Sequence, residues 1–339
     1  MSDDIKRVTR KDVAELAGVT PTIVSYVIND NRYVDTVKKK RVLAAIKELG
    51  YRPNSFARAL KGKQSNHILF IVDDLLSSHF AKIIKKMDSW AYEKGSFISL
   101  CESQNSDEFV SQIYQRYFDA VIIASGTFRQ KYIQQLIDTD IPVVLLEMRN
   151  YSKLHGEFAL INSGLYEGAR LCTRTLLEKG RKNLVYVHSR FVENNEFILE
   201  EDFRYHGFTD ELKVAGIDSY RIIQGYHDKI ELEETIGCLL DSGFRIDGIF
   251  GRTDSEAIPA MHILQQRGYD LPADCSVIGV NNSDLCNYVQ PSLSSLDINR
   301  GEIGEAAKHL LDKMLSHQNL DKDELHISLT AELIKRESL

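Results

Sequence analysis

The sequence has no run of about 18 consecutive apolar residues, which a membrane-spanning helix would need. Its opening residues, MSDDIKRVTR, also lack the apolar core of a secretory signal, so export is not expected. The five cysteines are scattered, odd in number and without a CxxC pair. This pattern argues against a disulfide framework or a zinc site and is typical of buried, reduced thiols. We therefore expect a cytoplasmic protein.

Motifs of catalysis are missing as well. The chain contains no HExxH, GxSxG or GxxxxGK[ST] segment, and its ten histidines are dispersed. An enzyme needs a nucleophile beside a base, or a group of metal ligands, and the sequence offers neither pattern. It therefore predicts no catalytic residue, no metal site and no cofactor.

Charge is distributed unevenly along the chain. Residues 1–63 hold 14 Lys and Arg against 7 Asp and Glu, a net charge of +7. Because the whole chain carries a net charge of −7, the remainder carries −14. A small basic segment on a large acidic body favours binding of a polyanion such as DNA by the N-terminal part. The alternative is a solvated basic surface without a partner.

The segment RKDVAELAGVTPTIVSYVIN, residues 10–29, predicts two short helices separated by a tight turn. Gly18 can adopt the left-handed conformation of the turn. Thr20 can cap the second helix, with Pro21 at its first position and Val24 as its apolar anchor. This spacing is typical of a helix-turn-helix, whose second helix enters the DNA major groove. An ordinary helical hairpin is the alternative.

A third helix is predicted over residues 36–49, ending at Gly50. Its expected inward stripe, which would close a three-helix core, consists of Val37, Val42, Leu43, Ile46 and Leu49. Residues 51–66 then predict a short helix that is too short to be stable alone and would order against DNA or a second copy. An interdomain linker is the other interpretation, and both can hold. The sequence thus predicts a head over 1–50 and a hinge over 51–66.

From residue 67 onward, short apolar strands alternate with helices in two consecutive series. Apolar strands joined by helices indicate parallel sheets covered on both faces. We expect an α/β body over 67–339 with two lobes: the first over about 67–161 plus 297–339, the second over about 162–296. A final strand near 327–333 is expected to return to the first lobe. In such sheets ligands bind at the carboxyl ends of the strands, so a cleft between the lobes is the expected ligand site.

The chain resembles the LacI/GalR family of bacterial transcription regulators. The matching segments run in the family's order: DVAELAGVT…VSYVIN, YRPN…ARAL, RTDSEA, SVIGVNNSD and PSLSSLDI, with IKRES near the end. The resemblance implies a helix-turn-helix head, a hinge helix and a two-lobed body similar to periplasmic sugar-binding proteins. It also implies a homodimer that binds a pseudo-palindromic operator, more often as a repressor than as an activator.

The resemblance assigns DNA-contacting roles by position. On the second helix it places Pro21, Thr22 and Tyr26 at base edges, and Ser25 and Asn29 at phosphates. In the hinge it implies that Leu60 wedges into the minor groove, while Asn54 and Arg58 hold the backbone there. Tyr26 stands where many members have arginine, which removes the usual bidentate contact with guanine. The full predicted set is Thr9, Thr20, Pro21, Thr22, Ser25, Tyr26, Asn29, Tyr33, Asn54, Ala57, Arg58 and Leu60.

The resemblance also implies a set of effector-binding residues: Phe80, Ser163, Arg204, Thr253, Asp254, Asn281 and Arg300. Ser163 and Asn281 replace aspartates that are common in the family, and Arg300 replaces an apolar residue. With Arg252 nearby, these changes predict a more positive cleft, suited to a phosphorylated or carboxylated effector. Alternatively, the arginines pair with Glu147 or Asp297, and Asp254 only caps a helix.

The sequence therefore predicts a DNA-binding transcription regulator controlled by a sugar or sugar phosphate. The alternative is a regulator whose body no longer binds a small ligand and serves dimerisation or senses a protein partner. A solute-binding protein would have a similar body, but it would need an export signal and no basic head.

Overall fold

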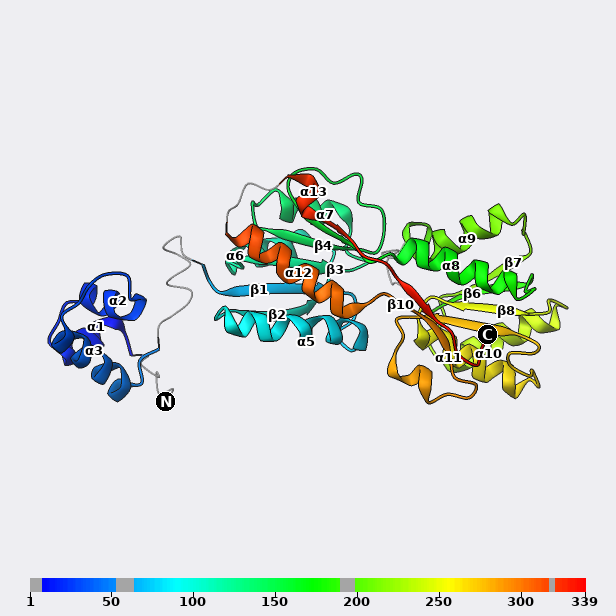
Figure 1. The fold of residues 1–339 in the computed structure, drawn as a ribbon, viewed down its shortest axis with the longest axis horizontal. Coiled ribbons are helices and arrows are strands. Elements are labelled where there is room, and N and C mark those ends of the chain that lie inside the picture. The colour runs from blue at the N-terminus through cyan, green and yellow to red at the C-terminus, as the bar shows by residue number, and fades with distance from the viewer. Residues whose placement is uncertain (1–7, 53–63, 190–198, 317–320) are drawn as a thin grey trace. The chain divides into compact units, whose positions relative to one another are not determined.

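The computed structural model describes residues 8–52, 64–189, 199–316 and 321–339. The chain forms two compact units, Met1–Ser65 and Asn66–Leu339, which we call the head and the body (Figure 1). Within the described ranges, no helix is both long and apolar enough to cross a membrane.

Residues 8–52 of the head form three helices whose ends are fixed by caps. They are α1 (Arg10–Ala17), α2 (Pro21–Asn29) and α3 (Thr36–Leu49). Thr9 and Asp12 form a capping box, in which the Thr9 N–H donates to the Asp12 carboxylate at 2.6 Å. Gly18 ends α1 with a φ of 63°, and the Thr20 hydroxyl accepts from the Ile23 N–H at 3.4 Å. Two helices and their turn are therefore encoded locally.

The core of the head is a narrow apolar cluster centred on Val13, Val24 and Val42, all fully buried. The predicted inward stripe of the third helix is partly wrong, because Val37 and Leu43 are 65% and 51% exposed. In a unit this small, each helix has only one neighbouring groove to fill. Val42 and the small Ala45 fill it for α3, so apolar residues on either side of them remain at the surface.

Lobe 1 of the body is built on a six-stranded parallel sheet in the order β11-β5-β4-β3-β1-β2. Its strands are β1 (His67–Val72), β2 (Phe97–Glu102), β3 (Ala120–Ala124), β4 (Val143–Glu147), β5 (Ala159–Asn162) and β11 (His326–Ser328). Its helices are α5 (Ser78–Glu93), α6 (Asp107–Gln115), α7 (Gln130–Ile137), α12 (Arg300–Leu315) and α13 (Lys322–Leu325). Strands β1, β3 and β4 are almost wholly buried, because separate apolar clusters cover the two faces.

Lobe 2 repeats this plan with the order β12-β10-β9-β8-β6-β7. Its strands are β6 (Leu184–His188), β7 (Tyr220–Gln224), β8 (Gly248–Gly251), β9 (Ser276–Val280), β10 (Ser294–Asp297) and β12 (Glu332–Ile334). Its helices are α8 (Leu165–Glu178), α9 (Phe203–Val214), α10 (Lys229–Asp241) and α11 (Asp254–Gln266), with short 3₁₀ turns η1 (Leu199–Glu201) and η2 (Asp284–Asn287). Figure 1 shows the two lobes of the body as separate sheets with their own helices.

Three crossings of the described chain join the lobes: from β5 to α8, from β10 to α12, and from β11 to β12. The first and third lie against each other. Gly164, with a φ of 72°, belongs to the first crossing, and a Cβ there would stand 2.7 Å from the Ala331 nitrogen of the third. Only glycine fits that approach without displacement.

The prediction that one final strand returns to the first lobe is only partly right. Residues 326–328 form β11 in lobe 1, but β12 crosses to lobe 2 and pairs antiparallel with β10. Ser338 also bonds to Val277 in β9, so the last residues belong to lobe 2 rather than lobe 1. Each sheet has an edge strand that needs a partner, and one continuous segment of the chain, residues 326–334, supplies both.

Candidate DNA-binding head and effector pocket

The residues predicted to read bases lie on one side of α2. Pro21 and Thr22 are exposed, and Tyr26 is partly buried one turn further on. Arg32, in the loop after α2, contacts both the ring and the hydroxyl of Tyr26. Its guanidinium carbon lies 5.2 Å from the Tyr26 ring centroid, and its Nη1 donates to the Tyr26 hydroxyl at 3.4 Å. The side chain at the critical position is thus oriented before any DNA arrives.

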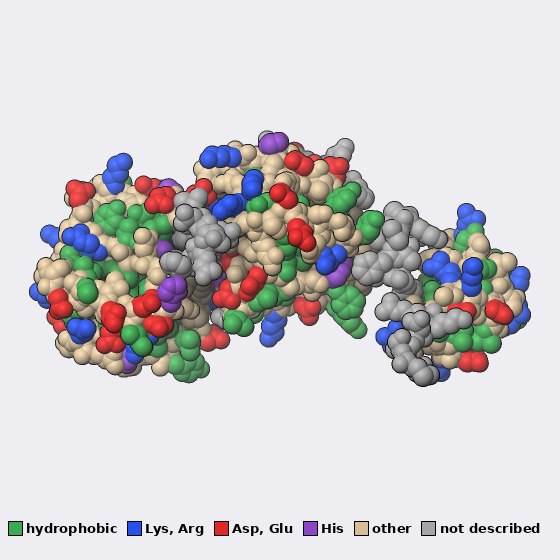
Figure 2. Space-filling view, turned by 180° about the vertical axis from the view of Figure 1, so that it is seen from behind, with side chains coloured by type: hydrophobic (Ala, Val, Ile, Leu, Met, Phe, Trp, Pro, Cys, Tyr) green, Lys and Arg blue, Asp and Glu red, His purple; other side chains and the backbone are tan. Residues whose placement is uncertain are grey.

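The other described side chains predicted to contact DNA are either bonded within α2 or exposed to solvent. The Asn29 side-chain amide donates back to Ser25, to its carbonyl oxygen at 2.8 Å and its hydroxyl at 3.2 Å. Thr9 and Thr20 are exposed, and Tyr33 is 92% exposed in the loop that follows α2. Figure 2 shows several Lys and Arg side chains on the visible face of the head, in keeping with its net positive charge. The predicted hinge residues Asn54, Ala57, Arg58 and Leu60 lie outside the described residues.

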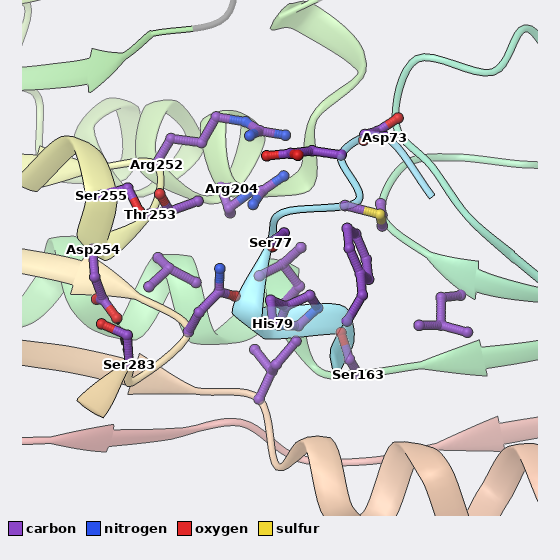
Figure 3. Close-up of a pocket in the computed structure, with 18 of the residues that line it drawn as sticks. Asp73, Ser77, His79, Ser163, Arg204, Arg252, Thr253, Asp254, Ser255 and Ser283 are labelled. Atoms are coloured by element: carbon purple, nitrogen blue, oxygen red, sulfur yellow. Dashed lines mark hydrogen bonds between the residues drawn. The ribbon is translucent and has the colours of Figure 1, made fainter. Parts of the chain in front are cut away.

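The body has a pocket of about 300 Å³ between its two lobes. Seven of its polar side chains lie at or directly after the carboxyl ends of six parallel strands. In lobe 1 these are Asp73 and Asp74 after β1, Glu147 at the end of β4 and Ser163 after β5; in lobe 2 they are Ser189 after β6, Arg252 after β8 and Asn281 after β9. The expectation of a cleft at the strand ends holds, and Figure 3 shows side chains from both lobes directed into one space.

The structure brings six of the seven predicted effector residues together in this pocket. They are Phe80, Ser163, Arg204, Thr253, Asp254 and Asn281. Asn281 has a φ of 95°, a conformation that side chains other than glycine adopt rarely and that often marks a functional site. Arg300 is the exception, because it lines a different groove of the body.

Comparison with known proteins agrees with this arrangement. Residues 9–54 match the family model described as "Bacterial regulatory proteins, lacI family", and residues 173–339 match that of the "Periplasmic binding protein-like domain". The chain is 28% identical over 338 residues to the HTH-type transcriptional repressor PurR of Mannheimia succiniciproducens, covering 98% of each. It is 29% identical to the HTH-type transcriptional regulator RegA of Clostridium saccharobutylicum, covering 97% of this chain and 98% of RegA.

Solved structures show the same architecture. The lac repressor dimer bound to operator and the anti-inducer ONPF matches with a TM-score of 0.80 at 21% identity, over 98% of this chain and 99% of that one. The chain belongs to the lacI family of bacterial regulatory proteins. It is a DNA-binding transcription regulator, with a helix-turn-helix head and a two-lobed α/β body.

In this lacI-family regulator, the arginine expected to grip the effector is already held by a carboxylate. Arg204 Nε and Nη2 donate to the two oxygens of Asp202 at 2.8 and 2.7 Å, a bidentate pair. Arg252 Nε donates to the same carboxylate at 2.8 Å. All three side chains are almost completely buried. Burial alone would raise the pKa of Asp202, but the charges of Arg204 and Arg252 hold it well below its usual range.

This cluster corrects the prediction of a positive cleft. Arg300 is not among the pocket residues, and Asp202 offsets much of the positive charge of Arg204 and Arg252. For Arg252, the alternative of ion pairing is therefore the observed state, although its partner is Asp202 rather than Glu147 or Asp297. Five carboxylates line the pocket beside the two arginines: Asp73, Asp74, Glu147, Asp254 and Glu256. An anionic ligand would meet more negative than positive charge there.

Two of these carboxylates accept hydrogen bonds that hold the structure of lobe 2. Asp254, at the start of α11, accepts from the Ser283 N–H at 2.6 Å and from the Ser295 hydroxyl at 2.5 Å. Burial raises the pKa of Asp254, and these hydrogen bonds oppose the rise. Glu256 closes a capping box with Thr253 and accepts from the Ser189 N–H at 3.2 Å. Both residues shape the lobe 2 wall of the pocket.

Other polar groups face the pocket with no hydrogen-bond partner for their side chains among the described residues. Glu147 and Ser163 are such groups in lobe 1, and Asn281 is one in lobe 2. Burial raises the pKa of Glu147. His79 is 8% exposed, and its Nδ1 is buried without a partner in the described structure. Burial, together with the charges of Arg300 and Arg204, lowers the pKa of His79 to about 3, so the ring is neutral.

Sequence analysis missed His79 and Asp202 and gave Glu147 the wrong role. Glu147 had a usable signal, because it is the polar residue that ends the apolar strand PVVLLE. His79 lies directly before Phe80, which was predicted. No sequence pattern around Asp202 indicated its role, because that role depends on Arg252, fifty residues away.

Proposed function

We propose that this regulator is a repressor that acts in the cytoplasm as a homodimer on a pseudo-palindromic operator, and that a neutral, hydroxyl-rich ligand such as a sugar controls it. In functional terms we assign DNA reading to residues 1–50, the hinge to 51–66, and ligand binding and dimerisation to 67–339. The observation that carries the choice of ligand is the set of unpartnered polar groups at the strand ends, beside arginines already bound by Asp202. Glu147 and Asn281 are only partly buried, so their polar atoms remain accessible from the pocket. Ligand hydroxyls can both donate to Glu147 and accept from Asn281.

The relatives support repression, since several carry the name HTH-type transcriptional repressor PurR. The dimer follows from symmetry, because one three-helix head covers only a half-site. Large exposed apolar side chains on lobe 1 also favour a second copy: Phe97 and Leu100 on the edge strand β2, with Tyr92 and Tyr114 on α5 and α6. Sedimentation equilibrium of the purified chain measures this dimer directly.

A thermal-shift screen tests the ligand class. Neutral mono- and disaccharides, their phosphates and small carboxylates are each added to the full chain, and a ligand that binds the folded state raises Tm. We expect a neutral sugar to stabilise the chain without needing a phosphate group. If no compound in the panel raises Tm, the result would instead favour a body that serves dimerisation or senses a protein partner.

Glu147→Gln is expected to weaken binding of the sugar found in that screen by roughly 10- to 100-fold, because a hydrogen bond to a charged acceptor contributes about 1.5–3 kcal/mol. Isothermal titration calorimetry measures the change. Glu157→Gln is the matched control, since Glu157 is an exposed carboxylate of lobe 1 that does not line the pocket. Equal affinities of the two variants would show that Glu147 does not contact the ligand.

Leu60→Ala is expected to reduce operator affinity about 10-fold or more while affinity for random DNA changes little. A leucine wedge opens a base step only at a site that bends, so its loss removes specific binding first. Fluorescence anisotropy with operator and scrambled duplexes measures both. The thermal transition of the body should be unchanged. An unchanged operator affinity would show that Leu60 does not act as a wedge.

A further inference from the structure

A second concave site lies on the body, apart from the pocket that holds the predicted effector residues. It is a groove of about 400 Å³ between α5 and the first turn of α12. Its lining residues are Lys82, Lys85, Lys86, Asp297, Asn299, Arg300 and Gly301. None of them lines the pocket that holds Glu147 and Arg204. The groove therefore needs its own explanation.

Arg300 is the residue that points to a ligand. Its side chain is 6% exposed, and Nη2 donates to the Asn282 carbonyl oxygen at 2.9 Å. Its Nη1 is buried without a hydrogen-bond partner among the described residues. A buried, unsatisfied donor on a charged group is costly, and such groups usually have an acceptor in the functional state. An oxygen of a ligand in the groove could supply this acceptor.

The surroundings of Arg300 favour a negatively charged acceptor. Lys82 and Lys86 are partly balanced by Asp284 and Glu305, at 2.7 and 3.0 Å, whereas Lys85 has no ion pair in the described part of the chain. The lone carboxylate of the lining, Asp297, accepts from the Asn299 N–H and the Asn282 side-chain amide, each at 2.8 Å. Its oxygens are thus engaged within the fold.

The N-terminus of α12 adds to the positive potential. This helix has 16 residues, and the first N–H groups of a helix have no partner inside it. Asn299 satisfies that of Glu302, at 3.4 Å. The helix dipole and free N–H groups beside an arginine form a recurrent arrangement for phosphate groups.

We propose that the α5–α12 groove binds the phosphate group of a small phosphorylated metabolite, as a second ligand distinct from the one in the pocket. Arg300 supplies a directed donor, the three lysines supply charge, and the start of α12 supplies backbone N–H groups. The groove has a volume of about 400 Å³, and the oxygens of Asp297 accept hydrogen bonds from within the fold.

Binding there is coupled to the position of the lobes. Lys82 and Arg300, both from lobe 1, contact Asp284 and Asn282 of lobe 2. Asn282 directly follows Asn281, which lines the pocket. A phosphate that draws Lys82 and Arg300 toward itself alters these two bridges. The anion and the pocket ligand must then change each other's affinity by the same factor.

Calorimetric titration in phosphate-free buffer at fixed ionic strength tests the site, with inorganic phosphate, glycerol 3-phosphate and neutral glycerol as probes. We expect saturable binding of both phosphates and none of glycerol. Arg300→Gln should weaken phosphate binding roughly 10-fold or more, since a charged hydrogen bond is lost. Lys85→Gln should weaken it severalfold, and its exposed position makes it safe for folding. Lys94→Gln is the control, because Lys94 ends α5, pairs with Asp312 and leaves the groove intact.

The outcomes separate this site from the pocket. Absence of phosphate binding overturns the proposal. So does binding that is equally strong in the folded Lys85→Gln and Lys94→Gln variants, since it would then lie elsewhere or be non-specific. Glycerol 3-phosphate binding more tightly than inorganic phosphate identifies a metabolite rather than the free ion as the ligand; the reverse order overturns the metabolite assignment. Neither Lys85 nor Arg300 lines the pocket, so failure of every sugar to bind leaves this test unaffected.

Discussion

Asp202→Asn is expected to lower the free energy of unfolding of the body by about 3–5 kcal/mol, the cost typical of removing one partner from a buried ion cluster. The substitution removes the negative charge that faces Arg204 and Arg252, both almost fully buried. It also replaces one acceptor oxygen by a donor, against guanidinium groups that can only donate. Urea denaturation followed by circular dichroism measures the change.

The matched control is Asp218→Asn, an exposed aspartate in the loop after α9, which should shift stability by less than about 0.5 kcal/mol. A loss of under about 1 kcal/mol in Asp202→Asn would mean that the two arginines find other partners. In that case the arginines would be available to a ligand, and the pocket would no longer favour a neutral effector.

The cluster also predicts how stability depends on pH. The pKa of Asp202 is held below its value in the unfolded chain, so the folded state favours the ionised carboxylate. Its stabilisation is fully present above the unfolded pKa, about 3.9, and is lost as pH falls through the lower folded pKa. Acid titration of the unfolding free energy should therefore be less steep in Asp202→Asn below about pH 4. Equal slopes would contradict the assignment.

Tyr26→Ala is expected to weaken operator binding by roughly 10- to 100-fold, since one lost base contact typically costs about 1–3 kcal/mol. Tyr26 lies on the exposed side of α2, and Arg32 already orients its ring and hydroxyl. Affinity for random DNA and its dependence on salt should hardly change, because phosphate contacts determine both. Anisotropy titrations at several salt concentrations separate the two effects.

Tyr26→Phe distinguishes the hydroxyl from the ring. If the hydroxyl reads a base edge, the phenylalanine variant loses nearly as much operator affinity as the alanine variant. If the ring contacts a thymine methyl group, the phenylalanine variant keeps most of it. A reduction of random-DNA affinity equal to that of operator affinity would instead place Tyr26 at a phosphate.

The sequence by itself determined the local elements and their order. Thr9, Gly18 and Thr20 fix the ends of the head helices through bonds that span at most a few residues, so their identities suffice. The apolar strands indicated the parallel sheets, and the strand-end rule indicated a cleft, while the family resemblance assigned Ser163 and Asn281 to it. Periodicity and capping are properties of neighbours in the chain, which a sequence displays directly.

Only the tertiary structure decided the electrostatic character of the site and the course of the final strand. Asp202 meets Arg252 across fifty residues, and Arg300 turns into a separate groove, so neither arginine has the role that its position in the sequence implied. Likewise, β12 joins lobe 2 because the edge of β10 is within its reach. The pKa of a carboxylate and the pairing of an edge strand depend on groups that are close in space but distant in sequence, and only the folded chain brings those groups together.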